Sequence, residues 1–189
     1  MNNKGFISVG VVLLVILLIG IFGFFSLYNG LKEAEILVDA SYGQVENQMQ
    51  RRSDLIPNLV NTVKGYDVHE KSIIEEVVNA RAKLAGAQGV EQMDAANAEL
   101  TGALGRLFAI AEAYPDLKAN TQYLELMREL SGSENRIAVA RRDYNEAVRE
   151  YNVRISTFPG MFLAGSMGMT QKPQFKAKEG ADAVPEVKF

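Results

Sequence analysis

The chain has no cysteine and no tryptophan, and it has only one histidine and five prolines among 189 residues. The absence of cysteine excludes a disulfide framework and thiolate metal sites, and it also excludes a lipid anchor on an N-terminal cysteine. It does not identify the redox compartment. The prolines stand near expected helix ends or in the C-terminal segment, which is typical of a long helical domain.

An excess of basic residues is missing as well. The chain carries 20 Lys and Arg against 23 Asp and Glu, for a formal net charge of −3. Nucleic-acid-binding domains usually show a basic patch and a basic pI. We therefore expect no nucleic acid among the partners of this protein.

Residues that could support catalysis are sparse. The only histidine, His69, precedes Glu70, but the H-E-x-x-H zinc motif needs a second histidine. Di-iron bundles need two Glu-x-x-His motifs, and the chain has none. Glycine-rich phosphate loops are also missing, and residues 86–89 are expected to form only a turn. We expect His69 to be a solvent-exposed helix residue, and we expect no enzyme activity, no cofactor and no metal site.

Charge is entirely absent between Lys4 and Lys32. Residues 6–27 are mostly Val, Leu, Ile and Phe, and a helix of about 20 such residues crosses a hydrocarbon core of about 30 Å. A cleaved signal peptide is the alternative. Its apolar core would be only about 7–15 residues long, and small residues would follow it. Here the bulky Tyr28 and Leu31 follow, so we predict a retained transmembrane anchor in contact with the lipid bilayer.

We predict four parts along the chain. They are a short flank (residues 1–5), the transmembrane anchor (6–27), a helical bundle domain (28–160) and an irregular C-terminal tail (161–189). Apolar residues of the tail offer a way to pack on the bundle, with partial mobility as the alternative: Phe162, Phe175, Val184, Val187 and Phe189.

Basic residues on the two sides of the anchor are nearly balanced, with Lys4 and the α-amino group before it and Lys32 after it. The positive-inside rule counts basic residues close to the membrane and largely ignores acidic ones. We interpret this balance as favouring a cytoplasmic N-terminus. The protein is then a single-pass protein of the cell membrane, with its folded domain outside the cytoplasm.

Apolar residues recur every three or four positions from Leu27 onward, which is typical of amphipathic helices. Four helices are expected: from the anchor to residues 51–52, from 53–54 to 84, from 90 to 114, and from 120 to 158. Pro57 is placed in the first turn of the second helix, where its missing N–H costs nothing. A kink is expected at Gly65 and a bend at residues 131–133. Long helices joined by short turns pack antiparallel. The predicted fold class is all-α, with an N-terminal transmembrane helix followed by a long antiparallel up-and-down helical bundle of about four helices.

Polar residues interleave with the apolar stripes of these helices. Asn58 and Asn61 share a helix face. Asn145 and Asn152 lie seven residues apart, and each follows a tyrosine. The candidate structural or interaction cluster is Arg51, Arg52, Asp54, Asn58, Asn61, Lys64, Glu134, Asn135, Arg136, Arg141, Arg142, Tyr144, Asn145, Tyr151 and Asn152.

Two interpretations of this cluster remain open. It is either a polar layer that sets helix register, as buried asparagines do in coiled coils, or a groove for a partner or ligand. In the first case, Asn58 and Asn61 are the expected neighbours of Asn145 and Asn152.

Three runs also resemble a known family. They are RRSDLIPNLVNTVKGY at 51–66, EAYPDLKAN at 112–120 and ENRIAVARRDYN at 134–145, followed by Tyr151-Asn152 and Phe158-Pro159. The chain resembles the LemA family of bacterial single-pass membrane proteins over nearly its whole length. The resemblance implies an N-terminal anchor, a long helical bundle and no established enzymatic activity. The association of some relatives with membrane proteases or organelle membranes suggests scaffolding.

Two functions are compatible with these features. The first is a membrane-anchored scaffold or adaptor without catalytic activity, which self-associates as a homo-oligomer or binds another membrane protein such as a protease. Gly20 and Gly23 would allow close approach of two anchors. The alternative is a ligand sensor or enzyme that uses the Asn, Arg and Tyr residues of the cluster.

Overall fold

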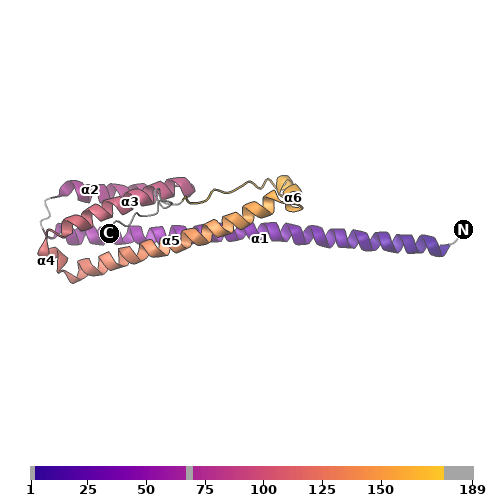
Figure 1. Cartoon of the computed structure of the whole chain (residues 1–189), viewed down its shortest axis with the longest axis horizontal. Helices are drawn as coiled ribbons and strands as arrows, with labels where there is room; N and C mark the ends of the chain where they lie inside the picture. The colour runs from indigo at the N-terminus through magenta and orange to yellow at the C-terminus, as the bar shows by residue number, and fades with distance from the viewer. Residues whose placement is uncertain (1–2, 67–69, 177–189) are drawn as a thin grey trace, which may run out of the picture. The chain divides into compact units, whose positions relative to one another are not determined.

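The computed structural model describes residues 3–66 and 70–176, and within these ranges it contains helices and no strand. The helices in chain order are α1 (Asn3–Lys64), α2 (Lys71–Gly86), α3 (Gly89–Ala111), α4 (Pro115–Lys118), α5 (Thr121–Ser156) and α6 (Gly160–Ser166) (Figure 1). The predicted all-α class is confirmed. The expectations for His69, Val184, Val187 and Phe189 concern positions outside the described residues.

The chain divides into two compact units, and each is considered by itself. Unit 1 consists of Met1–Ala40 and Glu146–Lys172, and unit 2 consists of Ser41–Asn145 and Pro173–Phe189. Helices α1 and α5 each contribute residues to both units.

Helix α1 passes without a break through Arg52 and Pro57, so the predicted end at residues 51–52 is wrong. Pro57 has no N–H to donate to the Ser53 carbonyl, which a proline in a helix interior normally leaves unpaired. In unit 2, Arg81 Nε of α2 donates to this carbonyl at 3.0 Å. A side chain therefore replaces the missing backbone hydrogen bond, and the helix continues to Lys64. The chain leaves the helix at Gly65, and α2 begins at Lys71. The prediction of one continuous helix from residues 53–54 to 84, with a kink at Gly65, is therefore wrong.

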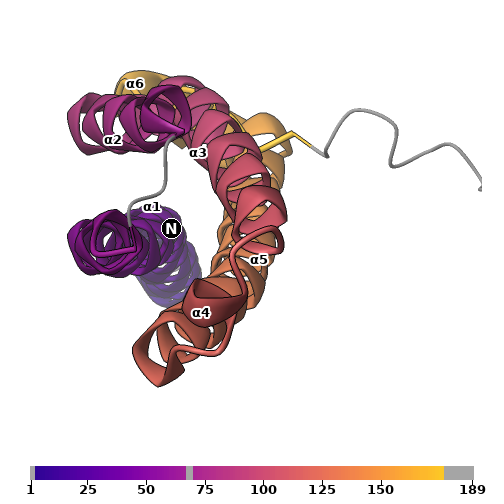
Figure 2. The same ribbon diagram turned by 90° about the vertical axis from the view of Figure 1, so that its left-hand side faces the viewer.

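Helices α2 and α3 lie side by side in unit 2 (Figures 1 and 2). The predicted turn between them is confirmed. It ends at Gly89, whose φ of 75° is strained for any residue with a Cβ atom. Helix α3 ends at Ala111, three residues before the predicted end. Helix α5 runs through residues 131–133, and Ser133 Oγ donates to the Leu130 carbonyl at 2.6 Å.

The core of unit 2 is built from the apolar faces of α1, α2, α3 and α5. Its fully buried residues include Val45, Ile56, Leu59, Val63, Val77, Leu100, Leu104, Leu107, Leu130 and Ile137. Most of them belong to the predicted stripes, because an amphipathic helix buries its apolar side.

Unit 1 has two different surfaces along α1. Its buried residues lie after the apolar segment or come from α5 and α6: Leu31, Ala34, Val38, Ala147, Val148, Tyr151, Ile155 and Ala164. The apolar residues from Val11 to Phe25, by contrast, are exposed. Within the described residues, one helix is long and apolar enough to cross a membrane, and this helix is α1.

The start of the predicted irregular tail contains a short helix, α6. The expectation that Phe162 packs on the bundle is wrong, because this side chain is 70% exposed. Phe175 is buried, as expected. The hydrophobic pattern does not separate these two phenylalanines, since it identifies apolar residues and not the surface they meet.

Candidate functional site

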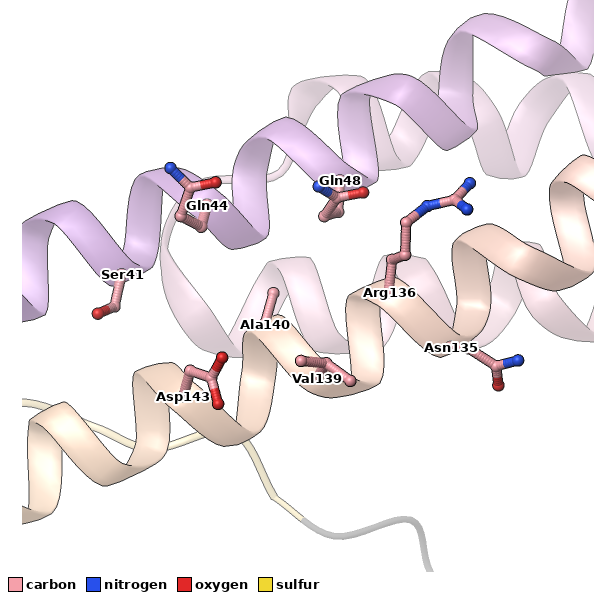
Figure 3. Close-up of a pocket in the computed structure, with 8 residues that line it drawn as sticks. All are labelled: Ser41, Gln44, Gln48, Asn135, Arg136, Val139, Ala140 and Asp143. Atoms are coloured by element: carbon pink, nitrogen blue, oxygen red, sulfur yellow. The ribbon is translucent and has the colours of Figure 1, made fainter.

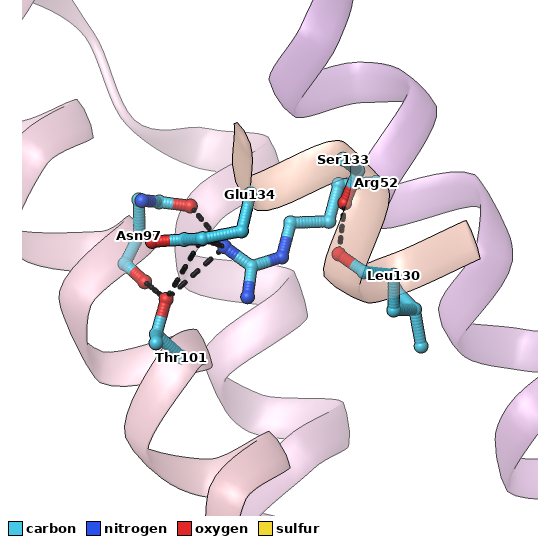
Figure 4. A network of polar contacts seen from close by, with 6 residues as sticks. All are labelled: Arg52, Asn97, Thr101, Leu130, Ser133 and Glu134. Atoms are coloured by element: carbon cyan, nitrogen blue, oxygen red, sulfur yellow. Dashed lines mark hydrogen bonds and ion pairs between the residues drawn. The ribbon is translucent and has the colours of Figure 1, made fainter. Parts of the chain in front are cut away.

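A buried polar network in unit 2 joins three helices through Arg52 (Figure 4). The Arg52 residue is only 3% exposed. Its Nη1 donates to Asn97 Oδ1 at 2.9 Å and to Thr101 Oγ1 at 3.1 Å, and it forms an ion pair with Glu134. Burial lowers the pKa of the Arg52 guanidinium, and the Glu134 carboxylate partly offsets this effect. The network therefore links α1, α3 and α5 through groups that need one another to remain buried.

The asparagines of the predicted cluster do not pair with one another. Asn58 and Asn61 are exposed on α1. Asn145 and Asn152 bind the backbone of the segment that follows α6, so the predicted neighbours of these two residues are wrong. The physical reason is that the amide of an asparagine side chain can form its hydrogen bonds with a backbone peptide group as well as with another side-chain amide.

In unit 2, Asn145 holds Phe175 by two hydrogen bonds. Its Nδ2 donates to the Phe175 carbonyl at 2.9 Å, and its Oδ1 accepts from the Phe175 N–H at 2.9 Å. The Tyr144 hydroxyl donates to the Pro173 carbonyl at 3.0 Å, and Arg141 Nη2 donates to the Lys176 carbonyl at 2.8 Å. We call this set the tail clamp.

The Phe175 ring completes the tail clamp. Its centroid lies 5.3 Å from that of Tyr144 in an edge-on arrangement, and the Arg141 guanidinium lies 4.9 Å from it. Arg141 also forms an ion pair with Asp94 of α3 at 2.8 Å. Such aromatic and cation–π contacts add to the burial of the ring. The tail clamp therefore binds backbone groups of three residues, Pro173, Phe175 and Lys176, and one side chain, that of Phe175.

Unit 1 contains a second asparagine of the same kind. Asn152 Nδ2 donates to the Lys172 carbonyl and Asn152 Oδ1 accepts from the Lys172 N–H, both at 2.9 Å. Lys172 Nζ lies 5.6 Å from the ring centroid of Tyr151. Asn152 therefore binds both the N–H and the carbonyl of one residue, as Asn145 does in unit 2.

An open groove of about 520 Å³ lies between α1 and α5 in unit 2 (Figure 3). Its lining residues are Ser41, Gln44, Gln48, Asn135, Arg136, Val139, Ala140 and Asp143. The Arg136 side chain extends from α5 toward α1 beside Gln48. We call this feature the α1/α5 groove.

The α1/α5 groove contains buried polar atoms that make no hydrogen bond. Among the described residues, these atoms are Gln48 Oε1 and Arg136 Nε and Nη2. Arg136 Nη2 forms an ion pair with Glu129 Oε2 at 3.6 Å, a distance longer than a hydrogen bond. Val139 is an exposed apolar side chain at the same place. Buried polar atoms are normally hydrogen-bonded. The Arg136 side chain as a whole is 39% exposed, so a rotation of this side chain would present its N–H groups to a partner in the groove.

The remaining residues of the predicted cluster lie elsewhere. Arg51 forms an exposed ion pair with Glu129, Asp54 accepts from Gln50, and Arg142 pairs with its neighbour Asp143. Lys64 is exposed in the last turn of α1. The structure thus distributes the predicted set over the Arg52 network, the tail clamp, the α1/α5 groove and solvated helix faces. No group of three or more His, Cys, Asp and Glu residues that could hold a metal ion occurs in the described ranges.

Sequence reasoning missed Asn97 and Thr101 in the network, and Gln44 and Gln48 in the groove. A signal for Asn97 was present, because it stands on the core-facing stripe of α3 among Met93, Leu100 and Leu104. One face of α1 carries polar residues at helical spacing, namely Ser41, Gln44 and Gln48. Such a pattern indicates a face that contacts solvent.

Comparison with known proteins gives consistent results. The sequence model described as "LemA family" matches residues 41–189. The magnetosome proteins MamQ 1 of Paramagnetospirillum magneticum and MamQ of Magnetospirillum gryphiswaldense are each 28% identical to the chain, over 76% of its length. The chain covers 62% of these relatives. Protein LemA of Metamycoplasma hominis is 28% identical over 89% of the chain and 78% of its own length.

Proposed function

The chain belongs to the LemA family, and we propose that it is a membrane-anchored helical adaptor that binds another protein through the α1/α5 groove. The single observation that carries this proposal is that polar atoms of Gln48 and Arg136 without a hydrogen bond lie in the same groove as the exposed Val139. A partner helix or loop that brings a donor, an acceptor and an apolar side chain would satisfy all three. Protein interfaces commonly combine such groups.

The anchor of this adaptor is the apolar segment of α1. Its side chains from Val11 to Phe25 are exposed to a degree that water does not favour, whereas a hydrocarbon core would solvate them. The α1/α5 groove would then face a second copy of this chain or another membrane protein such as a protease. Lys4 and the α-amino group precede the anchor and Lys32 alone follows it closely, and this small excess favours a cytoplasmic N-terminus.

Site-directed photo-crosslinking tests the groove. A photoreactive amino acid replaces Gln44, which lines the groove, in the full-length protein in its native membranes, and Val78, exposed on α2, serves as the control position. We expect a discrete adduct from position 44 and none from position 78. Equal labelling from both positions would contradict the proposal. A second variant, Val139→Glu, should abolish the adduct while the melting temperature stays unchanged, because this side chain is exposed.

The anchor and its orientation are tested separately. The protein should stay with membranes after carbonate extraction, and recovery in the soluble fraction would exclude a spanning helix. Because the chain has no cysteine, Gln88→Cys introduces a unique thiol. We expect an impermeant maleimide to label it without lysis of the inner membrane. Labelling only after lysis would reverse the orientation.

A further inference from the structure

Helix α6 buries small residues and exposes large apolar ones, whereas an ordinary surface helix buries its large apolar side chains. Its buried residues are the small Gly160 and Ala164, whereas the large Met161 and Phe162 are exposed and Leu163 is half-buried. Phe158, which precedes it, is 78% exposed, Phe162 is 70% exposed and Met161 is 48% exposed. The rings of Phe158 and Phe162 meet edge to face with centroids 6.2 Å apart. Contiguous exposed apolar surface of this kind marks an interaction site.

The sequence around α6 is free of charge. No Asp, Glu, Lys or Arg occurs from residue 155 to residue 171, between Arg154 and Lys172. A soluble protein interface normally has a polar rim close to its apolar centre. Because a charge in the hydrocarbon region is costly, a charge-free segment with exposed aromatic residues can enter the membrane interface without that cost.

Helix α6 is also placed beside the end of the apolar segment of α1, within unit 1. A Cβ atom on Gly160 would lie 3.6 Å from Leu31 Cδ2 and 2.2 Å from the Arg154 carbonyl oxygen, so only glycine allows this approach. Arg154 Nη1 donates to the Gly30 carbonyl at 3.1 Å. Leu31 is four residues beyond the apolar segment that ends at Leu27, which is a rise of about 6 Å along the helix.

We propose that Phe158, Met161 and Phe162 insert into the interface of the bilayer that α1 crosses, so that α6 is a second point of membrane attachment. This inference rests on the proposed anchoring of α1. An interfacial helix buries its apolar side about 5–10 Å deep at the boundary of headgroups and acyl chains. The rise from Leu27 to Leu31 places α6 within that depth of the hydrocarbon boundary. A lipid surface is therefore the occupant that this exposed apolar surface fits.

Tryptophan fluorescence tests the inference directly, because the chain has no tryptophan of its own. Three single-tryptophan variants of the full-length protein are reconstituted in phosphatidylcholine vesicles with and without brominated acyl chains. Phe162→Trp reports on α6 and Phe22→Trp on the apolar segment. Ile36→Trp is the control, since Ile36 is 65% exposed and about 14 Å beyond Leu27 along α1. All three replaced side chains are exposed, so the fold should tolerate the changes.

We expect brominated lipid to quench Phe22→Trp strongly and Phe162→Trp to an intermediate extent with a blue-shifted emission. Ile36→Trp should be unaffected. Loss of quenching in Phe162→Trp alone overturns the inference and leaves the anchor intact. A blue-shifted Phe162→Trp emission without quenching also overturns it, because a second copy of the chain would then cover α6. Loss of quenching in Phe22→Trp overturns the anchoring itself.

Discussion

The Arg52 network and the tail clamp, both in unit 2, use polar side chains for different purposes. In the network, side chains from α1, α3 and α5 bind one another. Each partner must therefore be a specific residue type at a matching position along its helix. In the tail clamp, side chains of α5 bind mainly backbone groups, which every residue possesses. The network can therefore specify helix register, whereas the tail clamp holds an extended segment by its backbone and recognises the side chain of Phe175.

The largest expected effect is on the network. Replacing Arg52 with Ala removes its ion pair with Glu134 and its hydrogen bond to Oδ1 of the buried Asn97. Removing one partner of a buried ion pair costs about 3–5 kcal/mol, and we expect a loss near the lower end of this range because the Glu134 side chain is 29% exposed. Urea unfolding of the full-length protein in detergent micelles, followed by circular dichroism, measures this loss.

The adjacent arginine is the matched control for that measurement. Arg51 forms an ion pair with Glu129 in which both side chains are largely exposed. Exposed pairs contribute about 0–1 kcal/mol, so Arg51→Ala should change stability only slightly. Equal effects of the two substitutions would remove the distinction between a buried network and a solvated surface.

The next effect concerns the tail clamp. Asn145→Ala removes both hydrogen bonds to Phe175 and leaves peptide groups of a half-buried segment unsatisfied. We expect a loss of about 1–3 kcal/mol, together with faster limited proteolysis near residues 173–176. The exposed Glu150 on α5 is the control, and Glu150→Ala should change stability by less than about 0.5 kcal/mol. A stable Asn145→Ala variant with lost partner binding would instead make the tail clamp a recognition surface.

The third prediction concerns the hydrogen bond from the Arg81 side chain to the Ser53 carbonyl in α1. Arg81→Ala should cost about 1 kcal/mol, because the Ser53 carbonyl then loses its donor. In a Pro57→Ala background, the new N–H can bind that carbonyl, so the same substitution should cost less. A double-mutant cycle gives the coupling energy between the two positions. A coupling near zero would mean that Arg81 does not compensate for the proline.

The smallest expected effect is at the end of the tail clamp. Lys176 contributes its carbonyl to Arg141, and its own side chain is exposed. Lys176→Ala should therefore change stability by less than about 0.5 kcal/mol in the same unfolding assay. A larger loss would show that the tail clamp depends on the identity of this residue.

Features that depend on neighbouring residues in the sequence were predictable. The apolar spacing indicates the long helices, and Gly89 supplies the positive φ in the turn before α3. The continuation of α1 through Pro57 was not predictable, because it depends on Arg81 of another helix. Local rules place proline near a helix start, and they cannot include a donor supplied by tertiary structure.

The candidate sites show the same limit. Asn145 and Asn152 stand out in the sequence, but their partners do not, since a peptide group carries no sequence signal. Arg52 and Glu134 were both in the predicted cluster, yet nothing local indicates that they meet. The exposure of Phe162 on α6 was not predictable either, because a hydrophobic pattern does not distinguish Phe162 from Phe175. Only the packing of Gly160 against Leu31 shows which of them faces outward.

The unbroken course of α1 sets a rotational phase between its apolar segment and the residues packed in unit 1. Each residue turns an α-helix by about 100°, so the angle about the axis between Leu27 and Leu31 is set by their separation. One residue inserted at Asn29 would turn Leu31 by about 100° relative to the apolar segment, whereas seven inserted residues would restore its direction to within about 20°. If the apolar segment rotates about its own axis, the side of α1 that contacts α6 therefore rotates by the same angle.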